Sequence, residues 1–201
     1  MISVGFSHRM TDGMIIKPFG EESISMLQGN IKDAPVTDYI CALLEKDSSK
    51  TSPGGFLESS ARFLDRVQKA SITNGKMIAV PHNPRLWDLI GTITNEYSKN
   101  KTISEMWAVL MKEGDFHMLH SHQKPGVVYD KSEFEGISGG LYLKIPEKKP
   151  PQGNINYVLD DKVFSWSPKD GDYFVWPSYV IHGVYPFKGP GSRIMVSWNS
   201  I

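Results

Sequence analysis

Six short segments after residue 100 restrict what this chain can fold into. Each is rich in β-branched and aromatic residues, and Gly, Pro and Asp separate one from the next. Short strands interrupted by turn residues are typical of an antiparallel sandwich or barrel. The segments are EMWAVLMKEG (105–114), FHMLHSH (116–122), ISGGLYLKIP (137–146), DYFVWPS (172–178), VIHGVYPF (180–187) and RIMVSWN (193–199).

The first hundred residues show a helical periodicity instead. Apolar residues recur at helical spacing in 36–44, in 56–67 and after Asn83-Pro84, a pair that suits the start of a helix. We therefore expect a single domain, residues 1–201, that is mainly β with α. In this prediction, residues 1–100 are a mostly helical support region that buttresses the β-barrel.

Composition and charge exclude several classes of protein. Lys plus Arg and Asp plus Glu number 22 each, and no basic run stands out. This balance argues against nucleic acid or an anionic membrane as a partner. No stretch has the length and apolar character of a membrane span or a signal peptide. Cys41 is the only cysteine, which fits a reducing compartment, and we expect a cytoplasmic protein.

Three of the six histidines lie close together between residues 117 and 122. Side chains of a strand alternate between its two faces, so His120 and His122 share one face. Phe116 and Met118 belong to that same face. His117 points to the opposite face unless a bulge intervenes. Two imidazoles at this spacing on an apolar face favour a metal chelate over core histidines.

The segment WPSYVIHGVYPF offers a third ligand. Val180, His182 and Val184 share a face, which is again apolar with one imidazole in its middle. Pro177 and Gly183 predict turns on either side, so that His182 lies on a short strand. The predicted metal ligands are therefore His120, His122 and His182.

Arg193 begins a strongly alternating segment near the C-terminus. Arg193, Met195, Ser197 and Asn199 share one face, and Ile194, Val196 and Trp198 share the other. If the apolar row packs against the helices, Arg193 points into the barrel, where an unpaired charge is costly. A guanidinium there favours a carboxylate that accepts two hydrogen bonds. Tyr142, next to glycines 139 and 140, is placed to donate its hydroxyl to the same anion.

The order of these motifs resembles the Fe(II)/2-oxoglutarate oxygenases. It is closest to the bacterial and viral branch related to the prolyl hydroxylases, over about residues 105–201. The resemblance implies a double-stranded β-helix, a jelly-roll or cupin-like barrel, over residues 101–201. It implies a dioxygenase that hydroxylates a substrate and releases succinate and CO2. By resemblance, Tyr142 and Arg193 hold the distal carboxylate of 2-oxoglutarate, and ascorbate serves as a reductant.

One departure from the family concerns the metal. The superfamily usually has an Asp or a Glu where this chain has His122, so the expected two-histidine, one-carboxylate set becomes three neutral imidazoles. Such a set should hold Fe(II) less tightly, and zinc or manganese can occupy it as well.

A cupin-like metalloenzyme, or a metal-binding barrel that does not use 2-oxoglutarate, is the alternative. Gly114, His120 and His122 match the opening of the cupin pattern, although its usual glutamate is missing. Arg193 at its spacing favours the oxygenase.

The remaining predictions concern the pocket and the substrate. The connection 123–136 is a candidate lid, and His117 a candidate for the surroundings of the metal. The expected substrate is a small molecule or a protein side chain, and the oligomeric state is left open. Candidate pocket-lining residues are Ser138, Ser197, Asn199 and Tyr129.

Overall fold

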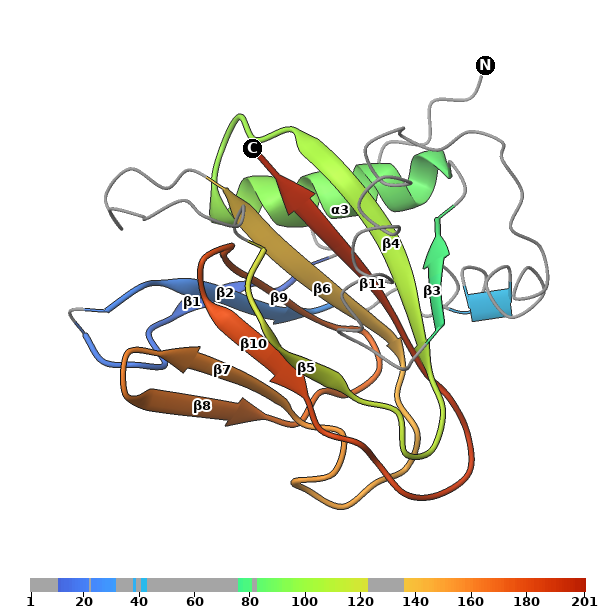
Figure 1. Ribbon diagram of the computed structural model, residues 1–201. Helices are drawn as coiled ribbons and strands as arrows, with labels where there is room; N and C mark the ends of the chain where they lie inside the picture. The colour runs from blue at the N-terminus through green and yellow to red at the C-terminus, as the bar shows by residue number, and fades with distance from the viewer. Residues whose placement is uncertain are drawn as a thin grey trace.

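Figure 1 presents the chain as a computed structural model, coloured from the N-terminus to the C-terminus. The structure describes residues 11–21, 23–31, 38, 41–42, 76–80, 83–122 and 136–201. The predicted helix at 56–67 and nearly all of the one at 36–44 lie outside these residues.

Two antiparallel sheets form the barrel. The major sheet has seven strands in the order β1-β2-β9-β6-β11-β4-β3, and the minor sheet has four in the order β5-β10-β7-β8. This mainly β architecture confirms the predicted double-stranded β-helix, and all six predicted segments contain a strand. The bounds are β1 (Met14–Ile16), β2 (Met26–Asn30), β3 (Lys76–Ala79), β4 (Ile103–Met111), β5 (His117–His120), β6 (Ile137–Lys144), β7 (Ile155–Leu159), β8 (Lys162–Trp166), β9 (Asp172–Pro177), β10 (Ile181–Val184) and β11 (Arg193–Ser200).

Helix α3 (Pro84–Tyr97) lies along the outer face of the major sheet (Figure 1). Its predicted start is confirmed, because the Asn83 side chain accepts a hydrogen bond from the Leu86 backbone nitrogen at 3.2 Å and Pro84 follows. Leu86, Leu89, Ile90 and Ile93 are buried against the sheet. Among the residues that the structure describes, no helix is both long and apolar enough to cross a membrane.

A second apolar cluster lies between the two sheets, so the central strands of the major sheet pack on both faces. On β11, Ile194, Val196 and Trp198 belong to the cluster under the helix, whereas Met195 belongs to the inner cluster. The alternation predicted for this strand is therefore confirmed. The inner cluster includes Trp107, Tyr142, Tyr157, Phe174, Trp176, Val180, Val184 and Met195.

The described residues before position 100 contribute strands as well as a helix. Strand β2 pairs with β9, and β3 pairs with β4, so that this region extends both edges of the major sheet. We expected mostly helical support here. Strands of three to five residues carry too few alternations to be distinguished in the sequence.

The hairpin β7–β8 was not among the predicted strands. Its two strands pair from Ile155↔Trp166 to Leu159↔Lys162. The connection contains Asp160, whose φ of 54° is one that Asp tolerates at a tight turn. This hairpin completes the minor sheet and places Tyr157 in the barrel interior.

Candidate metal centre

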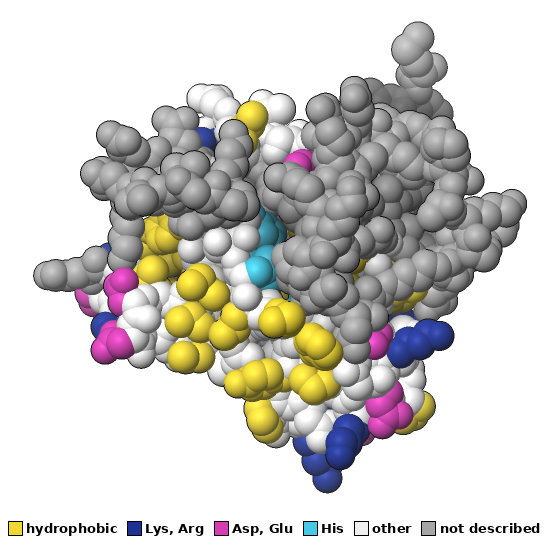
Figure 2. Space-filling view, in the orientation of Figure 1, with side chains coloured by type: hydrophobic (Ala, Val, Ile, Leu, Met, Phe, Trp, Pro, Cys, Tyr) yellow, Lys and Arg dark blue, Asp and Glu magenta, His cyan; other side chains and the backbone are white. Residues whose placement is uncertain are grey.

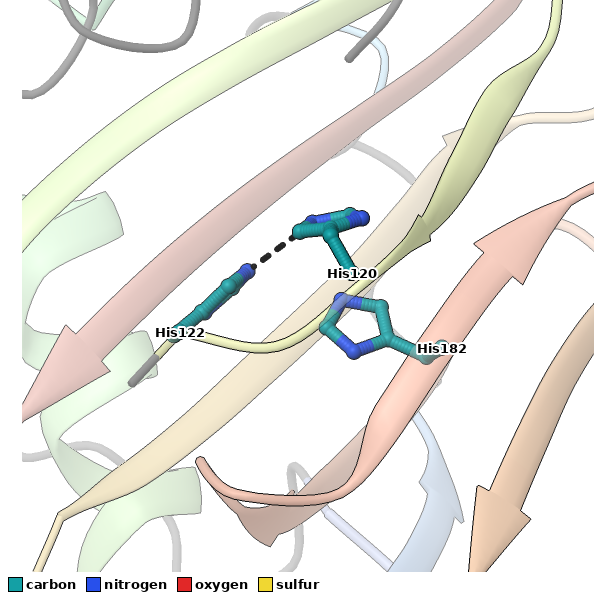
Figure 3. Close-up of side chains that lie close together, drawn as sticks. All are labelled: His120, His122 and His182. Atoms are coloured by element: carbon teal, nitrogen blue, oxygen red, sulfur yellow. Dashed lines mark hydrogen bonds between the residues drawn. The ribbon is translucent and has the colours of Figure 1, made fainter. Parts of the chain in front are cut away.

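Three imidazoles meet inside the barrel, between the two sheets (Figure 3). His120 on β5 and His182 on β10 are direct partners in the pairing of these two strands, and His122 follows the end of β5. One nitrogen from each ring lies within 4.8 Å of the other two. The predicted trio is therefore together in space, although its role as a ligand set is still an inference.

Hydrogen bonds on the far side of each ring fix which nitrogen faces the cluster. The Nδ1 of His120 donates to the Met118 carbonyl at 2.8 Å, and the Nδ1 of His182 donates to the Val180 carbonyl at 3.1 Å. His122 directs its Nδ1 to the Asn199 Oδ1 at 2.6 Å. Each Nδ1 therefore carries the proton, and each Nε2 carries a lone pair.

The chemistry of this donor set fits a metal ion. The Nε2 atoms of His120 and His122 lie 3.3 Å apart, although both carry lone pairs and neither has a proton to share. Two ligand nitrogens that are each about 2.1 Å from one ion lie roughly 3 Å apart, which is close to this separation. A cation between the rings would relieve the repulsion of the two lone pairs.

Burial keeps these imidazoles neutral, which is the form that binds metals. Burial lowers the pKa of His122 to about 3 and lowers the pKa of His120 from the usual 6.5. The pKa of His182 lies well below 6.5 because of burial, with His120 and His122 adding to the effect. At neutral pH, protons therefore do not compete with a metal ion for these nitrogens.

The predicted alternation of side chains between the two faces of the strand was wrong for part of β5. We expected Phe116 and Met118 to face the interior, but their side chains are 38% and 54% exposed. The pairing of β5 with β10 shifts register, from His182↔His120 to Val184↔His117, so a bulge breaks the alternation. The bulge turns His117 inward, where its ring centroid lies 4.8 Å from that of His120.

His117 reaches the interior, where its buried Nε2 forms no hydrogen bond with the described residues. Burial lowers its pKa well below 6.5, with further lowering from His120, His122 and Arg193. His117 thus lies near both the imidazole cluster and the arginine.

Gly183 was expected to mark a turn but belongs to strand β10. A Cβ at this position would lie 2.9 Å from the His117 carbonyl oxygen and 3.1 Å from the Leu119 nitrogen. The glycine therefore allows the bulged strand β5 to approach β10 closely.

Arg193 lies inside the barrel, as the alternation predicted, and only 1% of its surface is exposed. Its Nη1 donates to the Gly153 carbonyl at 2.7 Å, and its Nη2 lies 4.0 Å from the Met195 sulfur. Its Nε has no partner, and within the described part of the chain no carboxylate pairs with it. Burial lowers the pKa of this guanidinium. The protein thus holds a buried cation with spare donors.

Two tyrosines adjoin this cation. The Arg193 guanidinium carbon lies 5.0 Å from the centroid of the Tyr142 ring, and the buried Tyr142 and Tyr157 hydroxyls form no hydrogen bond of normal geometry within the described part of the chain. Burial raises the pKa of both phenols, so both are neutral donors. Sequence reasoning proposed Tyr142 but missed Tyr157, which pairs in register with His182. The signal for it was the alternation around Asp160 in INYVLDDKVFSW.

The structure separates the candidate pocket residues. Ser138 and Asn199 contact the His122 ring and not the arginine. Ser197 is buried on the same β11 face as Asn199. Tyr129, together with most of the 123–136 connection, lies outside the described residues.

The histidines are reachable from the surface. His120 and His122 are only partly buried, and Figure 2 shows histidine side chains at the surface, beside a group of apolar side chains. The exposed apolar residues of this region include Phe116, Met118, Leu119, Ile181 and Tyr185. A ligand can therefore reach the imidazoles without unfolding of the barrel.

Comparisons with known proteins agree with this geometry. Residues 105–199 match the family model described as "Putative 2OG-Fe(II) oxygenase". The chain is similar in structure to a prolyl-4-hydroxylase of Pseudomonas putida, with 14% identity, a TM-score of 0.59 and coverage of 88% of this chain and 92% of that one. A comparison with curated protein sequences gives no match.

Two further solved structures resemble the chain. HygX of Streptomyces hygroscopicus, with nickel and 2-oxoglutarate bound, has 12% identity and a TM-score of 0.55, with coverage of 95% of this chain and 83% of that one. SnoK, a non-heme alpha-ketoglutarate-dependent carbocyclase from nogalamycin biosynthesis, has 11% identity and a TM-score of 0.58, with coverage of 87% and 78%. At such identities these structures establish the shared fold. The family match covers residues 105–199, the region that carries all three histidines, so this part of the chain is similar to the Fe(II)- and 2-oxoglutarate-dependent oxygenases.

Proposed function

We propose that His120, His122 and His182 hold Fe(II), and that Arg193 and Tyr142 bind the distal carboxylate of 2-oxoglutarate. The chain is then a hydroxylase in which 2-oxoglutarate, O2 and a substrate C–H group give succinate, CO2 and the hydroxylated product. Zinc or manganese can occupy the same site without supporting this reaction, and ascorbate serves as a reductant that keeps iron in the ferrous state.

The observation that carries this proposal is the buried Arg193 without an acidic partner. A buried guanidinium costs several kcal/mol unless an anion pairs with it, and a ligand that supplies the anion would remove this cost. Among the described residues, neither the Arg193 Nε nor the Tyr142 hydroxyl has an acceptor at hydrogen-bond geometry. A carboxylate accepts from both, so a diacid that reaches from the imidazoles to Arg193 satisfies this end of the pocket.

The residues divide the work by position. Arg193 and Tyr142 fix the far end of the co-substrate, so that its keto acid end is directed toward the imidazole cluster. The inner cluster of aromatic residues, which includes Trp176 and Phe174, keeps bulk water away from the reacting groups. Bound Fe(II) supplies the redox chemistry that couples decarboxylation of the keto acid to hydroxylation.

An anaerobic titration tests the proposal directly. Adding Fe(II) and then 2-oxoglutarate to the full chain should produce a visible metal-to-ligand charge-transfer band. Arg193→Ala should weaken binding of the keto acid, while Arg85→Ala, which changes an exposed arginine on α3, should leave it unchanged. Fully loaded iron without a band, or equal behaviour of the two variants, would overturn the assignment of Arg193.

A metalloenzyme that uses no 2-oxoglutarate is the second candidate, and one observation favours it. The three imidazoles provide no negative charge, a set that zinc accepts readily. Turnover assays separate the two candidates: succinate formed from 2-oxoglutarate with iron and ascorbate, across a panel of substrates, supports the oxygenase. Binding of zinc without any response to 2-oxoglutarate supports the second candidate.

We further propose a small molecule or a protein side chain as the substrate and the cytoplasm as the location. The equal numbers of basic and acidic residues argue against nucleic acid as a substrate, and a sequence with Cys41 as its single cysteine fits a reducing compartment.

A further inference from the structure

The three imidazoles differ in the hydrogen-bond partners that fix their orientation. The Nδ1 atoms of His120 and His182 donate to backbone carbonyls two residues earlier in their own segments. The Nδ1 of His122 instead contacts side chains from two other strands, Asn199 on β11 and Ser138 on β6. His122 is therefore the candidate ligand whose orientation depends on side-chain chemistry.

Behind His122, three side chains form a row across the major sheet. Asn199 on β11 is paired in register with Glu105 on β4 and, on its other side, with Ser138 on β6. Directly paired residues place their side chains on the same face of a sheet. The Asn199 Nδ2 donates to the Glu105 Oε2 at 2.8 Å, and the Ser138 hydroxyl donates to the Asn199 Oδ1 at 2.8 Å.

The Glu105 carboxylate determines the orientation of the Asn199 amide, and with it the direction of the hydrogen bonds in this row. An ionised carboxylate only accepts hydrogen bonds, so Glu105 requires the NH2 end of the Asn199 amide. The amide oxygen must then face His122, where it accepts from Nδ1 at 2.6 Å. This fixes the proton on Nδ1 and leaves the lone pair of Nε2 for the imidazole cluster. With the amide reversed, its NH2 group would face Nδ1 and favour the tautomer that cannot bind a metal through Nε2.

The hydroxyls of Ser138 and Ser178 are oriented by the same amide. Because Ser138 donates its proton to the Asn199 Oδ1, its oxygen accepts from the Ser178 hydroxyl at 2.7 Å. In this arrangement, no two hydrogen-bond donors of the group are directed at each other.

We propose that Glu105 and Asn199 are positioning residues that make His122 a metal ligand. Because the ligand set itself has no carboxylate, the negative charge lies two hydrogen bonds behind His122, where it polarises the imidazole and strengthens its Nε2. This inference rests on the proposed metal site, but it requires neither 2-oxoglutarate nor turnover. Partners of this kind outside the ligand set typically change metal affinity by about 10- to 100-fold.

Metal affinity, measured without co-substrate, tests the proposal. Anaerobic competition between the full chain and a chromophoric chelator gives the dissociation constants of Fe(II) and Co(II). Asn199→Ala should weaken binding by about 10- to 100-fold, and Glu105→Leu by a smaller factor. Ser200→Ala removes a buried hydroxyl from the same strand without touching His122 and is the matched control. Thermal unfolding of each metal-free variant confirms that the barrel is folded.

An exchange of the two groups separates positioning from general packing. The double variant E105Q/N199D keeps one acid and one amide but places the acid directly behind His122. It should bind Co(II) within a few-fold of the original chain and give the same visible absorption spectrum, whereas Asn199→Ala should alter both. Equal affinity of Asn199→Ala and the original chain, or failure of the exchange variant to restore binding, would overturn the proposal.

The result is independent of the proposed reaction. If the chain binds metal and Asn199→Ala weakens it, the positioning role stands even if no keto acid binds. If the keto acid binds through Arg193 while Asn199→Ala leaves metal affinity unchanged, the positioning role fails and the proposed function stands.

Discussion

The two ends of the barrel interior differ in how far the protein satisfies its own polar groups. At the imidazole end, the Nδ1 atoms of His120, His122 and His182 all donate to protein acceptors. At the arginine end, the Arg193 Nε and the hydroxyls of Tyr142 and Tyr157 form no hydrogen bond with any residue that the structure describes. The first end therefore offers neutral lone pairs, which suit the proposed cation, and the second offers donors, which suit the proposed anion. A ligand that joins the two must carry opposite functions at its ends.

Acidification should destabilise the imidazole end most. The folded-state pKa values of His117, His122 and His182 lie below 6.5, so the unfolded chain binds more protons as the pH falls below 6.5. The stability that these neutral groups contribute is therefore full above pH 6.5 and is lost below it. For the metal-free protein we expect a loss of about 4 kcal/mol between pH 7.5 and 5.5, at about 1.4 kcal/mol for each histidine.

Urea unfolding of the metal-free chain at the two pH values measures this loss. His117→Leu should reduce the pH dependence by about one histidine's share, whereas Arg85→Met, a change at an exposed position on α3, should leave it unchanged. A free energy of unfolding that stays constant over this range would show that the histidines titrate normally in the folded state.

Arg193→Met should have opposite effects on binding and on stability. Removal of one partner of a buried ion pair costs about 3 kcal/mol, so affinity for 2-oxoglutarate should fall about 100-fold. Without a ligand, the same change removes a buried, unpaired charge at the expense of the bond to the Gly153 carbonyl. We expect the metal-free chain to gain about 1 kcal/mol and its Tm to rise by about 2–4 °C.

Calorimetric titration with the metal-loaded chain and a thermal melt without ligand test the two parts. Metal affinity should stay unchanged, which separates the arginine end from the imidazole end. A lower Tm together with unchanged affinity for the keto acid would identify Arg193 as a structural residue.

The strands that carry the two ends of the barrel interior differ in how well the sequence predicts them. β11 is a central strand with a partner on each side, so its alternation is regular and correctly placed Arg193 inside the barrel. β5 is an edge strand of four residues, and its bulge reverses the face on which His117 lies. Edge strands tolerate bulges because they have one neighbour, and a bulge leaves no signal in the alternation itself.

Contacts between distant strands were beyond sequence reasoning for a different reason. Tyr157 could have been found from its hairpin, but its place beside Arg193 depends on how the minor sheet covers the major one. The contact of Asn199 with Glu105 depends on the register of β11 with β4, which one sequence does not specify. The alternation therefore predicted which residues face inward, and the pairing determined which of them meet.

His122 is where the imidazole end departs from the usual ligand set. His122→Ala removes one of three ligands and should weaken Fe(II) binding by about 30- to 100-fold. His122→Asp supplies the charged oxygen ligand that is common in the superfamily and should retain affinity within about tenfold of the original chain. Chelator competition with Fe(II) measures both, and equal losses would place His122 outside the ligand set.

The smallest expected effect comes from the phenols at the arginine end. Tyr157→Phe and Tyr142→Phe each remove one neutral donor without changing the ring packing, and a hydrogen bond of this kind contributes about 1 kcal/mol. Affinity for 2-oxoglutarate should therefore fall about fivefold in each variant, far less than in Arg193→Met. Comparison of the two variants also shows which tyrosine contributes more to binding of the keto acid. Only Tyr142 was expected from the sequence. If Tyr157→Phe binds the keto acid as the original chain does while Tyr142→Phe does not, the anion lies on the β6 side of Arg193, and Tyr157 serves to pack the ring of its strand partner His182.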